Sequence, residues 1–446
     1  MTSTVISGPG AARSTTTRLQ DLTITEHTLT VPLTADNDGR TIEVFARVVT
    51  RGSEGGGGSA SNSASSAERT GSDLPYLVFL QGGPGFPAPR VFANPVAPAW
   101  LNAALDRYQV VMLDQRGTGR STPVTDAILE TGSAREVAEY MSHLRADGIV
   151  RDCESFREFL GAAPEQWNLL GQSFGGFTSL HYLTKYPKSV NNVFFTGGLP
   201  PVGRTTEEFY AATYDKMRWL SERYYRAFPE DREKIRQLVG LADAGKIVLP
   251  TGEVLSPSRL RSLGMLIGMT EGWQQLHSLL DWPADSNEFL YGLSSLLSFG
   301  GANPIYYALH ESSGSDGAVT NWSAQRVIPQ DFVDDVTLLT GEHVHSDWLD
   351  TVPHLQPWKD VALELAQWPW PRLYDADALR NSEARGVAAI YYRDAYVPVE
   401  FSIETAELMP GVHQVITNST EHNGLRDWGD KLLEHMFDLA EDKRYR

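Results

Sequence analysis

The chain has 446 residues, of which 41% are hydrophobic and 10% aromatic, and this composition predicts a globular core with a second, substantial domain or insertion. Its formal net charge of −18 excludes nucleic acid and anionic membrane surfaces as expected partners, because binding either requires clustered Lys and Arg. The single cysteine, Cys153, excludes an internal disulfide, and without a signal-peptide pattern or an apolar stretch long enough to span a membrane we expect a cytoplasmic protein.

The first part of the chain predicts a polar leader followed by a hairpin. Residues 1–17 are rich in Ser, Thr and Gly, and we expect them to form a flexible leader. Residues 29–33 and 41–49 predict two strands, the second with apolar side chains at alternate positions. Residues 51–73 are almost entirely Gly, Ser, Ala and charged residues, so they predict a flexible surface loop within the same domain.

Four short apolar runs then predict parallel strands. Segments with a helical pattern separate several of them, and continuous apolar runs of this length are typical of strands covered on both faces. The predicted fold class is therefore α/β, with a doubly wound, mostly parallel sheet. The four runs are Tyr76 to Leu80, Tyr108 to Leu113, Trp167 to Leu170 and Val190 to Phe195.

Beyond Gly198 the pattern changes to long amphipathic stretches with Trp- and Pro-rich loops. No clear strand returns before residues 386–392, so we predict a mainly helical cap at residues 205–376. The cap divides the core into a first part at residues 18–204 and a last part at residues 377–446. The amphipathic stretches lie at residues 207–227, 232–242 and 271–280, and the last part of the core adds a strand at 412–418 and a helix at 424–442.

The strongest local signal is a G-x-S-x-G motif that carries Ser173. It follows an apolar strand segment and precedes a segment of helical pattern, in the sequence Gly171-Gln-Ser-Phe-Gly-Gly176. Small residues on both sides of a serine permit a sharp strand-to-helix turn that exposes the hydroxyl above the strand ends. We therefore predict that Ser173 is a nucleophile; the alternative is an ordinary glycine-rich turn.

A serine hydroxyl is a poor nucleophile until a base accepts its proton, so a histidine and an orienting carboxylate are needed. Asp394 follows the strand at 386–392, and His422 follows the strand at 412–418. The carboxyl ends of parallel strands converge above the sheet, and the order serine, acid, histidine suits this arrangement. We predict Asp394 and His422 as the partners of Ser173; the alternatives are a turn aspartate and a surface histidine.

A glycine-rich loop after the first core strand predicts an oxyanion hole. Acyl transfer needs donors for the tetrahedral oxyanion, usually two backbone N–H groups. Gly82 and Gly83, in Gln81-Gly-Gly-Pro-Gly85, permit a close approach of the backbone to a substrate, and the N–H of Phe174 would be the second donor. The alternative for the glycine run is a tight turn.

Cofactor and metal sites are not expected. The segment Asp114-Gln-Arg-Gly-Thr-Gly-Arg-Ser121 lacks the spacing of either nucleotide-binding fingerprint, so we expect it to brace the site through ion pairs of Arg116 or Asp114. His343 and His345 are spaced as metal ligands can be, but no clear third ligand accompanies them in the sequence.

Together these segments resemble the proline iminopeptidase (prolyl aminopeptidase) family of α/β-hydrolases. The resemblance spans nearly the whole chain and implies an α/β-hydrolase fold with a helical cap. Members of the family commonly have His where this chain has Gln81. The segments that carry the resemblance are Gln81 to Gly85, Asp114 to Ser121, Gly171 to Gly176 and the distal pair Asp394 and His422.

The resemblance implies a serine aminopeptidase that releases N-terminal proline from small peptides through a prolyl-enzyme intermediate. It also implies cap glutamates that hold the free α-amine of the substrate, since a carboxylate in a cleft pairs well with an ammonium group. Glu311 and Glu342 lie in segments that resemble those bearing these glutamates, and Glu271 is a further candidate. The alternative for each is a solvated surface position.

Two other functions stay open from the sequence. The first is a carboxylesterase or amidase, or an aminopeptidase of another specificity, because the triad is shared and only the chemistry of the cap differs. The second is a non-catalytic binding protein with an inactive hydrolase fold. An esterase would ignore N-acetylation of its substrate, whereas a binding protein would be inert toward serine-directed phosphonates.

Overall fold

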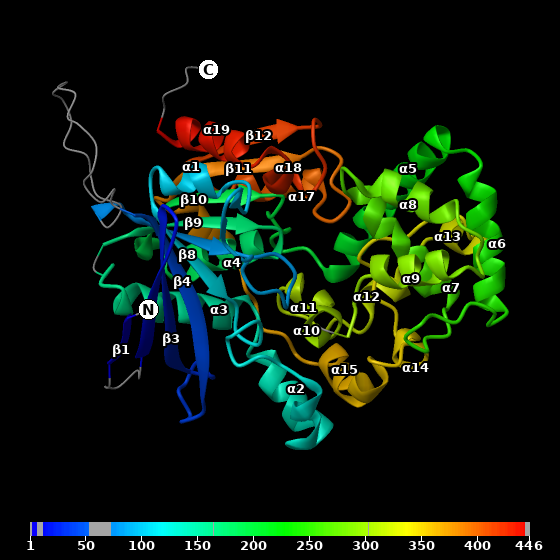
Figure 1. The fold of residues 1–446 in the computed structure, drawn as a ribbon, viewed down its shortest axis with the longest axis horizontal. Helices are drawn as coiled ribbons and strands as arrows, with labels where there is room; N and C mark the ends of the chain where they lie inside the picture. The colour runs from blue at the N-terminus through cyan, green and yellow to red at the C-terminus, as the bar shows by residue number, and fades with distance from the viewer. Residues whose placement is uncertain (1, 7–11, 53–72, 164, 302, 442–446) are drawn as a thin grey trace.

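A ten-stranded sheet runs through the molecule, in the order β1-β2-β3-β4-β8-β5-β9-β10-β11-β12 (Figure 1). The computed structural model describes residues 2–6, 12–52, 73–163, 165–301 and 303–441. From β1 to β8 neighbouring strands are antiparallel, and from β8 to β12 they are parallel. The strands are β1 Thr2–Ile6, β2 Ala12–Leu19, β3 Leu22–Pro32, β4 Thr41–Arg51, β5 Tyr76–Leu80, β8 Gln109–Asp114, β9 Trp167–Gln172, β10 Val190–Thr196, β11 Arg385–Tyr391 and β12 Val412–Thr417, with a separate small hairpin of β6 Phe92–Ala93 and β7 Val96–Ala97.

The antiparallel part is longer than the sequence indicated. The expected hairpin is present as β3 and β4, which pair from Leu22 with Arg51 to Pro32 with Thr41. The expectation of a flexible leader is wrong for residues 2–6, which form β1, and for residues 12–17, which belong to β2 and pair with β3. The β-branched Thr side chains of residues 12–17 favour a strand although the composition is polar. The expected flexible loop at 51–73 lies, apart from its ends, outside the described residues.

The parallel strands are covered on both faces, which confirms the predicted class. In β5, Val78 and Leu80 pack in the core that includes α3 and α4, whereas Leu77 and Phe79 pack in the core that includes α1 and α19. The helices around the sheet are α1 Leu101–Leu105, α3 Ala146–Phe159, α4 Phe174–Lys185, α17 Val399–Ala406, α18 Gly424–Trp428 and α19 Asp430–Ala440, with short 3-10 segments at Asp126–Glu130 and Pro187–Ser189. Helix α2 Ala134–Ser142 instead packs against the helix at Lys359–Ala366.

Between β10 and β11 the described residues form helices, with one isolated bridge between Val248 and Val254. Most of these helices lie together beside the sheet, on the right of Figure 1. They are α5 Thr206–Ala227, α6 Asp231–Asp243, α7 Pro257–Arg261, α8 Gly272–Leu280, α9 Asn287–Leu296, α10 Pro304–Ala308, α11 His310–Ser313, α12 Ser323–Arg326, α13 Gln330–Asp334, α14 Trp348–Thr351, α15 Lys359–Ala366 and α16 Ala376–Arg380, with 3-10 segments at Ser262–Gly268 and Gln356–Trp358. We refer to α5 through α15 as the cap.

The expected single helix at 424–442 is divided into α18 and α19 at Gly429. This glycine has φ +51°, and a Cβ there would lie 2.5 Å from the carbonyl oxygen of Ala99. The helix therefore breaks where its backbone meets the loop before α1, a long-range contact that the local pattern does not encode.

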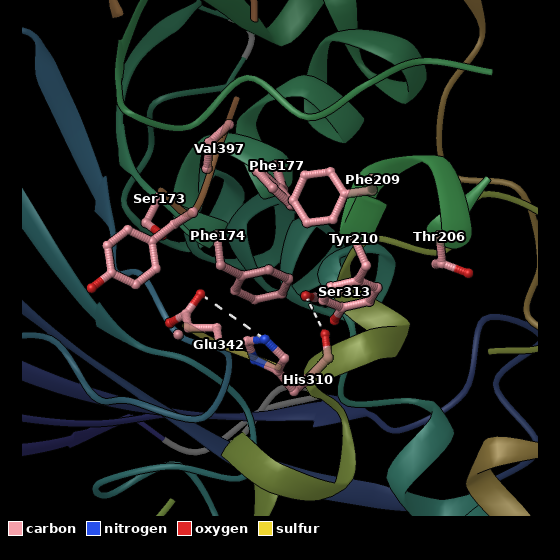
Figure 2. Close-up of a pocket in the computed structure, with 13 residues that line it drawn as sticks. Ser173, Phe174, Phe177, Thr206, Phe209, Tyr210, His310, Ser313, Glu342 and Val397 are labelled. Carbon is pink, nitrogen blue, oxygen red and sulfur yellow. Dashed lines mark hydrogen bonds and ion pairs between the residues drawn. The ribbon is translucent and has the colours of Figure 1, made fainter. Parts of the chain in front are cut away.

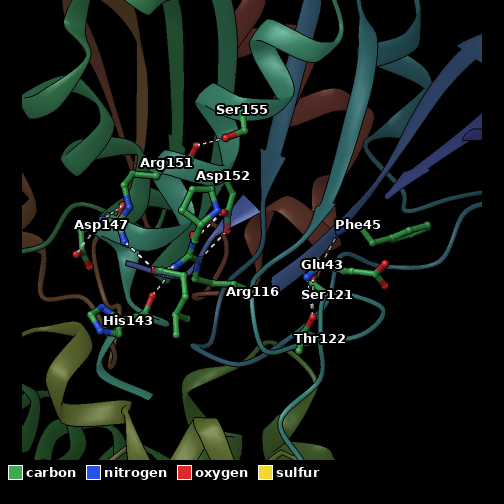
Figure 3. A network of polar contacts seen from close by, with 12 residues as sticks. Glu43, Phe45, Arg116, Ser121, Thr122, His143, Asp147, Arg151, Asp152 and Ser155 are labelled. Carbon is green, nitrogen blue, oxygen red and sulfur yellow. Dashed lines mark hydrogen bonds and ion pairs between the residues drawn. The ribbon is translucent and has the colours of Figure 1, made fainter. Parts of the chain in front are cut away.

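The loop after β8 is anchored by the fully buried side chain of Arg116 (Figure 3). Its Nε and Nη2 donate to the two carboxylate oxygens of Asp152 on α3, at 2.8 and 2.6 Å. Its Nη1 donates to the carbonyl oxygens of Leu33 and His143, both at 2.9 Å. The ion pair expected at Arg116 is present, and it joins β3, β8 and α3 beneath the loops that form the site.

Candidate active site

Ser173 occupies a sharp turn between β9 and α4, with φ 53° and ψ −124°. Its N–H donates to the carbonyl oxygen of Thr196 on the neighbouring strand, at 3.0 Å. The flanking glycines are required by close backbone contacts: a Cβ at Gly175 would lie 1.8 Å from the carbonyl oxygen of Leu80, and one at Gly176 would lie 2.2 Å from that of Gly198. The turn is the strained strand-to-helix geometry that exposes a nucleophilic serine.

Asp394 and His422 lie together, although 28 residues separate them in the sequence. Nδ1 of His422 is 2.7 Å from Oδ2 of Asp394, and both side chains are buried. The other oxygen, Oδ1, accepts the N–H groups of Tyr396 and Val397, at 2.8 and 2.9 Å. The carboxylate is therefore fixed from both sides, and it fixes the imidazole in turn.

Ser173 lies between two cavities at the junction of sheet and cap. The larger, about 410 Å³, contains Ser173 and His422 in its lining. The smaller is closed in by aromatic side chains of the core and the cap (Figure 2). Ser173, Gly83 and Glu342 line both cavities. The aromatic residues around the smaller cavity are Phe174, Phe177, Phe209, Tyr210 and Tyr396.

The residues predicted for the oxyanion hole lie beside Ser173. A Cβ at Gly82 would lie 3.0 Å from Cβ of Ser173, so the backbone of the glycine loop is close to the serine. Gly83 lines both cavities, and Phe174 is the first residue of α4. The first N–H groups of a helix have no acceptor within the helix, so the N–H of Phe174 suits a developing negative charge.

Glu342 reaches the site from the cap, in the loop before α14. Its Oε1 accepts a hydrogen bond from the hydroxyl of Tyr306. Its Oε2 lies 4.0 Å from Nε2 of His310 (Figure 2). Burial lowers the pKa of His310, which favours the neutral imidazole. No Lys or Arg of the described residues is paired with Glu342, so its charge is open to a ligand. The sequence did not identify Tyr306 or His310 as its supports.

The structure does not place Glu311 in either cavity. The side chain is 6% exposed, and its two oxygens accept the N–H groups of Ser323 and Ala324, at 3.0 and 2.8 Å. Burial raises the pKa of Glu311 to about 7, against the opposing effect of these N–H groups. Glu311 thus supports the start of α12, and the expected direct contact with a substrate amine is not supported. Glu271 is exposed before α8 and also lines neither cavity.

The neighbouring histidines of the cap have structural partners. His343 accepts the N–H of Gly341 at 2.9 Å, contacts Oγ1 of Thr213 at 2.9 Å and stacks on Tyr214. Burial lowers the pKa of His343 and of His345, as expected for core imidazoles.

Burial also raises the pKa of the Cys153 thiol well above its usual value. In the described part of the chain, no helix is both long and apolar enough to cross a membrane.

Comparison with known proteins gives one family match and several relatives. Residues 75–292 match the family model described as alpha/beta hydrolase fold. A proline iminopeptidase of Aeromonas sobria is 35% identical over 433 residues, which are 93% of this chain and 96% of that protein. The proline iminopeptidase aneH of Aspergillus aculeatus is 30% identical over 390 residues, or 83% and 86% of the two chains. A proline iminopeptidase of Neisseria gonorrhoeae is 29% identical over 163 residues, or 35% and 41%.

Proposed function

This chain belongs to the proline iminopeptidase family, and from that premise we propose that it is a serine aminopeptidase that removes N-terminal proline from small peptides. The observation that carries the proposal is the position of Glu342, which lines the same cavities as Ser173 and has no Lys or Arg partner among the described residues. A free α-ammonium group would pair with this carboxylate, whereas an internal peptide bond has no charge to offer.

In the proposed reaction, Ser173 attacks the carbonyl carbon of the first residue while His422 accepts the proton of the serine hydroxyl. Asp394 orients the imidazole and stabilises the imidazolium that forms. The N–H groups of the glycine loop at Gly82 and Gly83 and of Phe174 stabilise the oxyanion. His422 then gives its proton to the leaving amine, and water activated by the same imidazole hydrolyses the prolyl ester and regenerates the serine.

The smaller cavity supports the choice of proline. A pyrrolidine ring is compact and apolar, and the aromatic side chains that surround this cavity offer a matching surface next to Ser173. Because Glu342 lines the same cavity, the ring and the ammonium nitrogen of an N-terminal proline would be bound together. A cytoplasmic location is part of the proposal, supported by the single, buried cysteine.

The function is tested by hydrolysis of proline β-naphthylamide beside its N-acetylated form and the alanine analogue, with wild type and Ser173→Ala. We expect fast cleavage of the free-amine proline compound, at least about 100-fold slower cleavage of the acetylated one, and loss of activity in Ser173→Ala. Equal cleavage of the acetylated compound would leave a general amidase or esterase. Retained turnover in Ser173→Ala would remove the serine mechanism.

A further inference from the structure

The larger cavity is lined by two opposite charges in addition to the catalytic groups. Apart from His422, its lining contains one carboxylate, Glu342, and one guanidinium, Arg426. Glu342 comes from the cap, and Arg426 comes from α18 at the C-terminal end of the core. The nucleophile Ser173 lines the cavity that both charges face.

The backbone at Arg426 is anchored, whereas its exposed side chain is not neutralised. Leu425, the preceding residue, is buried in the core and anchors α18. Within the described residues, the guanidinium of Arg426 has no hydrogen bond, ion pair or ring contact. The neighbouring acid, Asp427, instead accepts from the hydroxyl of Thr270 and from Nδ2 of Asn423.

The positive charge of Arg426 acts on Tyr396, a residue that packs against His422. Burial raises the pKa of Tyr396 well above its usual value, and the positive charge of Arg426 opposes that rise. The ring of Tyr396 lies 4.6 Å from that of His422, measured between centroids. Arg426 and His422 also line the same cavity, so the guanidinium is within reach of a group bound beside the imidazole.

The geometry points to Arg426 as the binding group for the C-terminal carboxylate of a short peptide substrate, which makes a dipeptide with both termini free the preferred substrate. This inference rests on the proposed function. His422 must reach the nitrogen of the leaving amine, so the residue that bears this nitrogen lies on the side of His422 and α18. In a dipeptide the same residue carries the C-terminal carboxylate, which is separated from this nitrogen by the Cα atom alone. A zwitterionic dipeptide would thus place its ammonium at Glu342 and its carboxylate at Arg426, with the scissile bond at Ser173.

The test compares Pro-Gly, its C-terminal amide and proline β-naphthylamide with wild type, Arg426→Gln, Arg426→Lys and Lys431→Gln. Lys431 is the matched control, because it is an exposed cation on the adjacent helix and lines neither cavity at Ser173. We expect Arg426→Gln to lower kcat/KM for Pro-Gly about tenfold relative to its amide, the low end for a charge-assisted hydrogen bond because the site is open to solvent. Arg426→Lys should recover part of the loss.

The outcomes separate this inference from the proposed function. A selective loss on Pro-Gly relative to its amide in Arg426→Gln, without the same loss in Lys431→Gln, supports the carboxylate site. The same ratio of Pro-Gly to amide in wild type and Arg426→Gln would overturn it while the aminopeptidase stands. Failure of the wild type to cleave proline β-naphthylamide would overturn the proposed function, and this inference with it.

Discussion

At the scale of single residues, the cap glutamates differ by their partners. Glu342 has a hydroxyl and a neutral imidazole beside it and faces the cavities, whereas Glu311 gives both oxygens to backbone N–H groups of α12. Only the first is available to a substrate ammonium. Both are carboxylates in a helical insertion, so the sequence alone could not assign them different environments.

Glu342→Gln tests this assignment. Replacing the carboxylate by a neutral amide removes a charge-assisted hydrogen bond worth about 1.5–3 kcal/mol, so kcat/KM for proline β-naphthylamide should fall about 10- to 100-fold. The rate of labelling of Ser173 by a small neutral phosphonate, which has no ammonium, should stay within about twofold and serves as the control. A parallel loss of labelling would show that Glu342 maintains the serine site instead of binding the amine.

At the scale of elements, the turn that carries Ser173 depends on glycines that admit no side chain. Gly175→Ala would place a Cβ 1.8 Å from the backbone of β5, and neither α4 nor β5 can move without disturbing the sheet. We expect a loss of at least about 3 kcal/mol in the free energy of unfolding, measured by urea denaturation. Gly240→Ala in α6, where a Cβ would meet nothing within 4 Å, should instead stabilise by about 0.5–1 kcal/mol. Equal effects of the two changes would contradict this explanation.

The elements themselves show what the sequence can and cannot encode. The strands β5, β8, β9 and β10 were predictable because each lies in a short apolar run. The positions of Asp394 and His422 were predictable because residues after parallel strands meet at one edge of the sheet. β2 was missed because its Thr-rich surface has no apolar periodicity, and the break at Gly429 because its cause is the distant Ala99. Arg426 lies in the segment 424–442, which the sequence predicts as a single helix. No feature of the neighbouring sequence indicated that its side chain would line a cavity.

At the scale of the whole molecule, the buried Glu311 and the partly buried Glu421 couple stability to pH. Burial raises the pKa of Glu311 in the cap to about 7, and burial together with the charge of Asp394 does the same for Glu421 in the core. In the unfolded chain a Glu ionises near pH 4.3. Between that value and about pH 7 the folded state therefore holds protons that the unfolded state has released, and the contribution of these groups to stability falls as pH rises.

The double variant Glu311→Gln/Glu421→Gln should remove this part of the pH dependence. We expect the urea midpoint of wild type to fall more steeply between pH 5 and pH 7.5 than that of the double variant, since amides do not titrate. Because all other titrating groups are shared, the difference between the two curves isolates the two carboxyls. A difference that is constant with pH would show that neither group carries a raised pKa.

The insertion of the cap between β10 and β11 also sets the order in which the site is completed during synthesis. The strand that carries Ser173 leaves the ribosome before the whole cap, whereas Asp394 and His422 leave it after the cap. A growing chain that has folded its first strands thus holds a serine without a base, and without the glutamate that would retain an amine. Under the proposed mechanism, peptidase activity therefore appears only after nearly all of the chain has been made.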